Sequence, residues 1–284
     1  MSLPPACPVC GGSPGPLFPG LLACGACGLA FKTEKDLSPA VYAPGLEAGI
    51  YGAAKKKLFA SGLDFLGRAL PHRGRLLDIG CAGGELLKAA AAQGWEADGV
   101  ELDPCLAQKA AGLGFHVYSR PVEDCFLDSG TYSAVTVFEV FSQMEDPGRA
   151  VSETFGIIRP GGYIYIREFN AAFHLPLYAL ELRGFFKPFG LSPSVVHNFN
   201  FRTRTLRLML ESAGFRDIAI SNSPPTSGDP YRTGGALGGF LTGALKVLYY
   251  RLAQALWLIT FGRVYAGSTL IVTAKKWPPD EPSS

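Results

Sequence analysis

The sequence lacks several features that would place the chain in a common special class. No uncharged apolar run reaches the roughly 18 residues that suggest a membrane-spanning helix. The opening residues, MSLPPACPVCGG, do not show the charged-then-apolar pattern of a secretory signal. Charged residues make up 18% of the 284 and hydrophobic residues 48%, which suits a globular protein with a substantial core. We therefore expect a cytoplasmic protein, with at most a peripheral contact at the inner face of the membrane.

Cysteine is present in an odd number, seven, which argues against a disulfide framework. Four of the seven form two C-x-x-C pairs, Cys7 with Cys10 and Cys24 with Cys27, and 13 residues separate the pairs. Four thiolates in two such pairs make a closed tetrahedral Zn²⁺ site, which leaves no position for a substrate. We expect residues 1–31 to form a small zinc-ribbon-like module with a structural zinc. The alternatives are a ribbon that has lost its metal and a redox pair.

The rest of the chain shows an alternating pattern. After a linker and helix lead-in at 32–57, short apolar strands and helical stretches follow one another from about 58 to 166. This alternation predicts an α/β fold with a mostly parallel sheet and helices on both faces. Residues 167–200 are aromatic and read as irregular, whereas TRTLRLMLESAGF (203–215) predicts an amphipathic helix. We expect one large domain over 58–284.

The stretch LLDIGCAGGELL (76–87) carries the strongest chemical signal. An apolar strand ends in Asp78, and a glycine-rich turn leads into a helix, which is a general device for binding phosphates or nucleosides. The Lys-Ser/Thr of a phosphate loop is absent, and the glycine spacing is not that of a dinucleotide site. Glu85 also opposes an anionic ligand. Glu101, at the end of the next strand, is placed to accept hydrogen bonds from a ribose, so a nucleoside with a cationic end fits best.

Three further segments complete a family pattern: VELDP (100–104), FEVFSQMEDP (138–147) and IIRPGGYIYI (157–166). With the glycine turn they resemble the class I S-adenosylmethionine-dependent methyltransferases, over about 58–220 and the last strand. The resemblance implies a Rossmann-like, seven-stranded, mostly parallel sheet whose last strand is antiparallel. It also implies S-adenosylmethionine as the cofactor. That cofactor already carries an activated methyl group, so the protein contributes alignment and exclusion of water.

The resemblance also implies the cofactor-binding residues. The turn would contact the methionine part, and the two following strands the ribose and adenine: Asp78, Gly80, Cys81 (through its backbone), Ala82 and Gly83, then Glu101, Leu102, Val122 and Glu123. Glu139 and Val140 would lie beside the methionine end and the acceptor.

The acceptor side is less patterned. Gln143 stands where many small-molecule enzymes of this type carry the His of a Glu-His pair, which puts a general base there in doubt. An amide could still bind an acceptor by hydrogen bonds. His197 is our candidate base or acceptor ligand, and His174 is a weaker one; for both, the alternative is a structural role. The catalytic candidates are therefore His197, Glu139 and Gln143.

A helical insertion at about 222–266 separates the last two strands. Its apolar residues recur at helical spacing: Leu241, Leu245, Leu248, Leu252, Leu256 and Ile259. Between Tyr231 and Lys276 there are six Lys/Arg and no acids. A basic amphipathic helix suits a membrane interface or a long apolar substrate, so we expect peripheral membrane contact through 236–262. The alternative is packing against the domain or a second subunit, and the oligomeric state stays open.

The sequence thus predicts methyl transfer to a small or lipid-linked acceptor, with O- or C-methylation favoured. A second hypothesis is an RNA methyltransferase that uses the ribbon for recognition. Since the ribbon region has only Lys32 and Lys35 as cations, too few for phosphates, nucleic acid is an unlikely partner. The third hypothesis is a cofactor-binding regulatory protein without catalysis.

Overall fold

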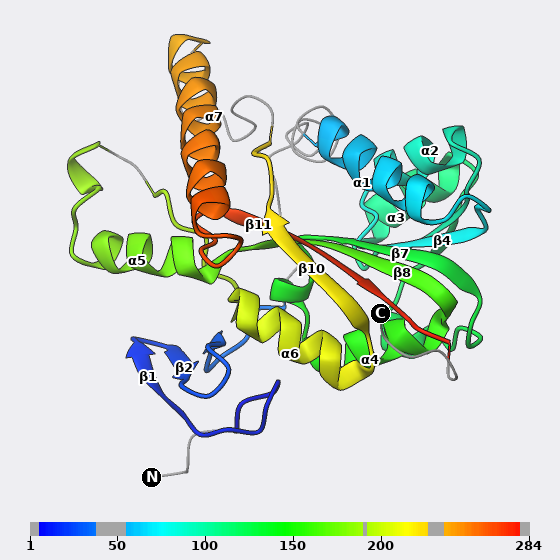
Figure 1. Cartoon of the computed structure of the whole chain (residues 1–284), viewed down its shortest axis with the longest axis horizontal. Coiled ribbons are helices and arrows are strands. Elements are labelled where there is room, and N and C mark those ends of the chain that lie inside the picture. The colour runs from blue at the N-terminus through cyan, green and yellow to red at the C-terminus, as the bar shows by residue number, and fades with distance from the viewer. Residues whose placement is uncertain (1–5, 38–54, 190–191, 227–235, 279–284) are drawn as a thin grey trace.

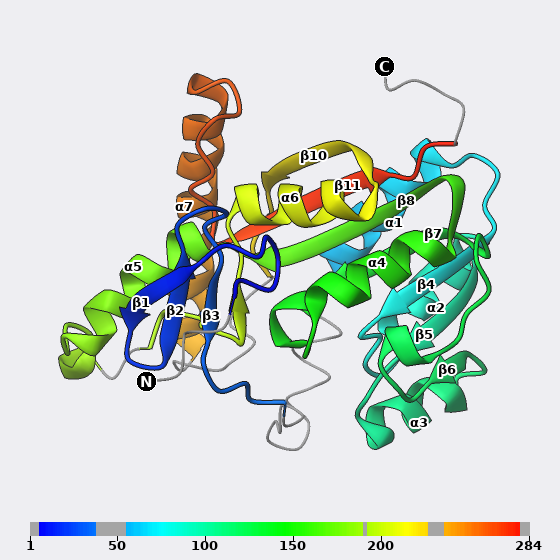
Figure 2. The ribbon, with the colours of Figure 1, turned by 90° about the horizontal axis from the view of Figure 1, so that it is seen from below.

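The computed structural model describes residues 6–37, 55–189, 192–226 and 236–278 and contains two sheets (Figures 1 and 2). The larger sheet has seven strands in the order β10-β11-β8-β7-β4-β5-β6. In chain order they are β4 (Arg75–Ile79), β5 (Glu96–Val100), β6 (His116–Tyr118), β7 (Tyr132–Phe138), β8 (Ile158–Phe169), β10 (Arg216–Asn222) and β11 (Thr269–Lys275). β11 runs antiparallel to both of its neighbours, and the pairs from β8 to β6 are parallel. The predicted seven-stranded α/β fold is confirmed.

Helices cover both faces of this sheet. The helices of the described residues are α1 (Lys56–Ala69), α2 (Glu85–Ala92), α3 (Pro104–Gly112), α4 (Pro147–Ile157), α5 (Ala171–Leu182), α6 (Thr203–Ala213) and α7 (Ala236–Ile259), with short 3-10 turns η2 (Val122–Asp124), η3 (Phe141–Gln143) and η4 (Lys187–Phe189). One apolar cluster packs α1 and α2 on the sheet, and a second packs α4 and α6. Because both faces are covered, all seven residues of β7 are buried.

The smaller sheet joins the N-terminal cysteine module to the large domain. Its strands β1 (Pro14–Phe18), β2 (Leu21–Cys24), β3 (Ala30–Lys32) and β9 (Phe199–Asn200) lie in that order. β9 comes from the large domain, and Ala30 pairs with Asn200 across the junction. The Thr205 hydroxyl donates to the Cys27 carbonyl at 3.0 Å. The cysteine module and the large domain therefore share both a sheet and a core.

The structure corrects the expectation of irregular chain over 167–200, because α5 forms there. Its sequence, AAFHLPLYALEL, is apolar on most sides and contains Pro176, so it shows no clear helical stripe. Asn170 begins the helix, since its side-chain oxygen accepts a hydrogen bond from the Ala172 amide at 3.0 Å. The long helix predicted within 222–266 is confirmed as α7.

Candidate functional site

The glycine turn lies at the carboxyl end of β4, the edge at which open parallel sheets bind ligands. Gly80 has φ +79°, and a Cβ there would lie 2.3 Å from Val140 Cγ2. Only glycine lets this turn approach the loop after β7 so closely. Gly84, with φ +85°, precedes the first turn of α2. The amides of Gly80 and Cys81 both donate to the Val100 carbonyl, at 2.8 and 3.0 Å, which ties the turn to β5.

Glu101 holds the turn from the next strand. Its carboxylate accepts hydrogen bonds from the amides of Ala82 at 2.8 Å and Asp103 at 2.9 Å, and burial raises its pKa. The adjacent Leu102 is 56% exposed, so a flat apolar ring can lie against it. Val122 packs into the main core, and Glu123 beside it is half-buried. The residues expected around a nucleoside thus line one edge of the sheet.

Asp78 makes this edge of the sheet favour a cationic ligand group. Its side chain is 3% exposed and accepts a hydrogen bond from the Thr136 hydroxyl at 2.6 Å. Burial raises the pKa of its carboxyl to about 7. It lines a small cavity together with Lys55, Ala82, Glu85 and Phe138. A cationic ligand group placed here would stabilise the carboxylate, which suits a sulfonium cofactor with an amino-acid end.

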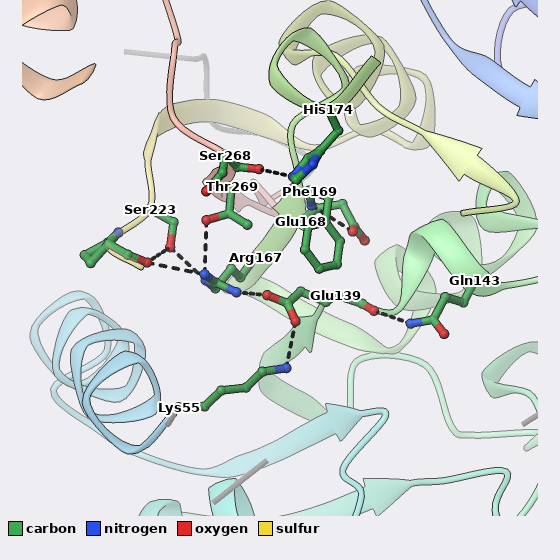
Figure 3. Close-up of polar contacts among 11 residues, drawn as sticks. Lys55, Glu139, Gln143, Arg167, Glu168, Phe169, His174, Ser223, Ser268 and Thr269 are labelled. Carbon is green, nitrogen blue, oxygen red and sulfur yellow. Dashed lines mark hydrogen bonds and ion pairs between the residues drawn. The ribbon is translucent and has the colours of Figure 1, made fainter. Parts of the chain in front are cut away.

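A buried charge network lies beside this cavity (Figure 3). Glu139, in the left-handed conformation at φ +64°, follows β7. Its carboxylate pairs with Lys55 Nζ at 2.7 Å and with the Arg167 guanidinium. Arg167 also donates to the hydroxyls of Ser223 at 2.8 Å and Thr269 at 3.0 Å. Burial, with the nearby Arg167 charge, lowers the pKa of Lys55 to about 7. The structure therefore places Glu139 as a counter-ion between two cations.

Sequence reasoning missed Lys55, Arg167 and Glu168. Glu168 is fully buried and accepts from the amides of Ser142 at 3.1 Å and Phe169 at 2.9 Å, and burial raises its pKa to about 7. The sequence marks two of them, because Arg167 and Glu168 are charged residues near the carboxyl end of the apolar strand YIYIREF. Lys55 had only its place in a basic run to mark it.

Two histidines lie around Phe169 on the acceptor side. His174 uses both ring nitrogens: Nε2 bonds to the Ser268 carbonyl at 3.0 Å, and Nδ1 accepts from the Val195 amide at 3.1 Å. The His197 ring lies 5.3 Å from that of Phe169, and its buried Nε2 has no hydrogen-bond partner in the part of the chain that the structure describes. Burial, helped by the Lys32 charge, lowers the pKa of His197 to about 4. His197 thus offers a neutral imidazole, whereas His174 has a structural role.

Gln143 is exposed, and its side-chain amide donates to the Glu139 carbonyl at 2.8 Å. Its own carbonyl accepts from Asn198 Nδ2 at 3.2 Å. The structure therefore brings the three catalytic candidates to neighbouring segments. Through these bonds Gln143 supports the loop after β7. His197 directly precedes Asn198, the residue that bonds to Gln143.

The four cysteines of the N-terminal pairs form a cluster whose sulfurs all lie within 4.8 Å of one another. Cys7 and Cys27 sulfurs are 3.5 Å apart, as are those of Cys10 and Cys24. A tetrahedron of thiolates about 2.3 Å from zinc has edges of about 3.8 Å, so these residues fit a zinc ion. The turn that contains each pair is closed by a glycine amide, which donates from Gly11 to the Cys7 carbonyl and from Gly28 to the Cys24 carbonyl, both at 2.8 Å.

Comparison with known proteins identifies the family. A family model described as a methyltransferase domain matches residues 51–220. Ubiquinone biosynthesis O-methyltransferase from Coxiella burnetii is 26% identical over 168 residues, which cover 56% of this chain and 71% of that protein.

Solved structures share the fold. A SAM-dependent methyltransferase from Archaeoglobus fulgidus aligns with a TM-score of 0.53 and 17% identity, over 81% of this chain and 98% of that one. Geranyl diphosphate C-methyltransferase from Streptomyces coelicolor A3(2) aligns with a TM-score of 0.52 and 19% identity, over 84% and 86%. The chain belongs to the methyltransferase domain family, and it is an S-adenosylmethionine-dependent methyltransferase.

Proposed function

We propose that this enzyme methylates a hydroxyl oxygen, or an acidic carbon, of a small or lipid-linked acceptor, and that His197 receives the acceptor's proton. Bound S-adenosylmethionine supplies an electrophilic methyl group and leaves as S-adenosylhomocysteine. The O-methyltransferase activity in the name of the Coxiella relative supports oxygen as the acceptor atom.

The observation that carries the proposal is the buried Nε2 of His197, which has no hydrogen-bond partner among the described residues. Leaving such a nitrogen without a partner is unfavourable by about 1–3 kcal/mol, and an acceptor hydroxyl would relieve this. Because the pKa of His197 is lowered, the ring is uncharged at neutral pH, and in the tautomer that carries its proton on Nδ1 the Nε2 atom accepts a hydrogen bond. As the carbon–oxygen bond forms, the hydroxyl proton passes to Nε2, and solvent removes it after product release.

The Glu139 network has a positioning role in this proposal. Lys55 and Arg167 hold the Glu139 carboxylate on both sides, so it is not free to act as a base. Glu139 also donates its backbone amide to the Arg167 carbonyl at 2.6 Å. These contacts fix the loop after β7 between the cofactor turn and the acceptor side.

The test compares His197→Gln with His116→Gln, an exposed histidine at the far edge of the sheet. Transfer of radiolabelled methyl from S-adenosylmethionine into solvent-extracted lipid and into aqueous cell extract identifies the fraction that holds the acceptor. His197→Gln should lower that rate by roughly 100-fold or more, with S-adenosylmethionine affinity changed by less than about twofold. His116→Gln should do neither. An unchanged transfer rate in His197→Gln would refute the assigned role.

We also infer that the four-cysteine cluster holds a structural zinc ion, which the sulfur spacing supports. A nucleic-acid role for the ribbon gains no support from its cations. Lys35 donates to the Glu145 carbonyl at 2.6 Å and lies over the Phe199 ring, so it is already engaged within the protein.

A further inference from the structure

α7 projects from the rest of the molecule in both overall views (Figures 1 and 2). Its C-terminal part contacts β10 through Ala253, which is buried and whose carbonyl accepts from Asn222 Nδ2 at 3.2 Å. Tyr249 adds a hydrogen bond from its hydroxyl to the Ala266 carbonyl. Much of the helix surface is exposed over the residues whose side chains the structure describes, 243–259.

That uncovered surface is strongly apolar. One stripe along the helix is exposed: Leu245, Leu248, Leu252, Leu256 and Ile259. At 100° per residue, Val247 and Leu258 lie well outside this stripe, and both are also at least half exposed. Phe261, in the turn after the helix, is 90% exposed. Soluble monomers rarely leave so many large apolar side chains together in water, which marks an interaction surface.

The charge of the segment narrows the choice of partner. Residues 236–264 contain Lys246, Arg251 and Arg263 and no acidic residue. A second copy of the helix would add only more positive charge and would cover one stripe. An anionic lipid surface supplies the opposite charge, and its acyl region can cover apolar groups on more than one side. Each cation near such a surface contributes about 1 kcal/mol to binding.

We propose that α7 and the turn to Val264 dock on an anionic lipid bilayer, with the leucine stripe below the head groups. None of the helices in the described ranges is long and apolar enough to cross a bilayer, so α7 acts at the surface.

The docked surface is continuous with the acceptor side. The ring of Tyr249 on α7 lies 5.1 Å from that of Phe173, which lies 4.9 Å from His174. His174 in turn packs on Phe169, the neighbour of His197. A lipid-linked acceptor could therefore reach the site from the bilayer, although docking itself does not depend on that part of the proposed function.

The test is co-sedimentation of the full chain with vesicles of phosphatidylcholine alone and with added phosphatidylglycerol. The wild type should bind the anionic vesicles at least tenfold more tightly than the neutral ones. The triple variant Leu248→Gln, Leu252→Gln, Ile259→Gln should lose binding to both. A matched control, Leu113→Gln with Phe126→Gln, removes exposed apolar side chains elsewhere and should bind as the wild type does.

Two further measurements interpret a loss of binding. Unchanged affinity for S-adenosylmethionine shows that the triple variant retains the fold and the methyltransferase site, which separates this proposal from the assignment of His197. Light scattering reports the oligomeric state without lipid. The proposal would be overturned if the wild type bound neither kind of vesicle. It would also be overturned if the wild type formed a dimer that the triple substitution abolished, with no binding to vesicles.

Discussion

Gly80→Ala is the most direct test of the close approach between the cofactor turn and the loop after β7. The new Cβ would lie 2.3 Å from Val140 Cγ2, much closer than van der Waals contact. Valine has two branches on Cβ and few alternative rotamers, so it cannot easily turn away. The left-handed φ of +79° adds a second penalty that alanine must bear.

The size of the effect follows from these two terms. The left-handed conformation costs alanine about 1–2 kcal/mol, and overpacking of this kind costs about 1–3 kcal/mol. Gly80→Ala should therefore lower the free energy of unfolding by about 2–5 kcal/mol. Adding Val140→Ala leaves only the Val140 Cβ position, at 3.4 Å, as the nearest of its atoms. The double variant should recover the overpacking term of about 1–3 kcal/mol and retain the backbone term.

Urea denaturation of the four proteins in this cycle measures the coupling, and calorimetric titration with S-adenosylmethionine follows the site. We expect the single variant to bind the cofactor at least about tenfold more weakly. A displaced turn has to cost only about 1.4 kcal/mol of binding free energy to produce that change. Gly112→Ala is the matched control, because a Cβ at the exposed end of α3 meets nothing within 4 Å. Additive effects of Gly80→Ala and Val140→Ala would refute the steric argument.

Three other predictions concern charge and metal. Glu101→Gln replaces an acceptor of two backbone hydrogen bonds and should weaken cofactor binding roughly 10- to 100-fold by calorimetry, whereas Glu96→Gln at the exposed start of β5 should not. Because burial raises the pKa of Asp78 to about 7, native protein keeps a proton that unfolded chain releases near pH 4, so stability falls as pH rises from about 4 to 7. Asp78→Asn should reduce the fall in melting temperature between about pH 4 and pH 7. An unchanged slope of melting temperature against pH would contradict this prediction. Metal analysis should find about one zinc per chain, lost in Cys24→Ser and retained in Cys105→Ser; no zinc in the wild type would exclude the structural-zinc assignment.

The large sheet was predictable because its signals are local. Each strand is marked by its own apolar run, and the turn at 76–87 carries its glycines within a few residues. The partners of Glu139 were not predictable in the same way. Lys55 and Arg167 lie 84 and 28 residues from it along the chain, and nothing in the sequence pairs them. Only the packed structure shows that one carboxylate meets both cations.

The two candidate histidines show a second limit. In the sequence, His174 and His197 occupy similar aromatic surroundings. In the structure His174 is buried and His197 half-buried, and burial lowers the pKa of both. What separates them is whether backbone groups reach the ring nitrogens. The Ser268 carbonyl and the Val195 amide satisfy His174, and their positions depend on distant loops. Residue type and spacing carry no information about such contacts.

The pairing of β3 with β9 has a consequence for how the protein is made. Asn200 donates from its side chain to the Ala30 carbonyl across 170 positions of chain. At about 5–20 residues per second, a ribosome needs roughly 10–30 s to add the residues between them. During that interval the first three strands of the small sheet lack their edge partner, and Cys7, Cys24 and Cys27 lack the core that later buries them. Early capture of a metal ion would protect these thiols from oxidation until synthesis reaches β9.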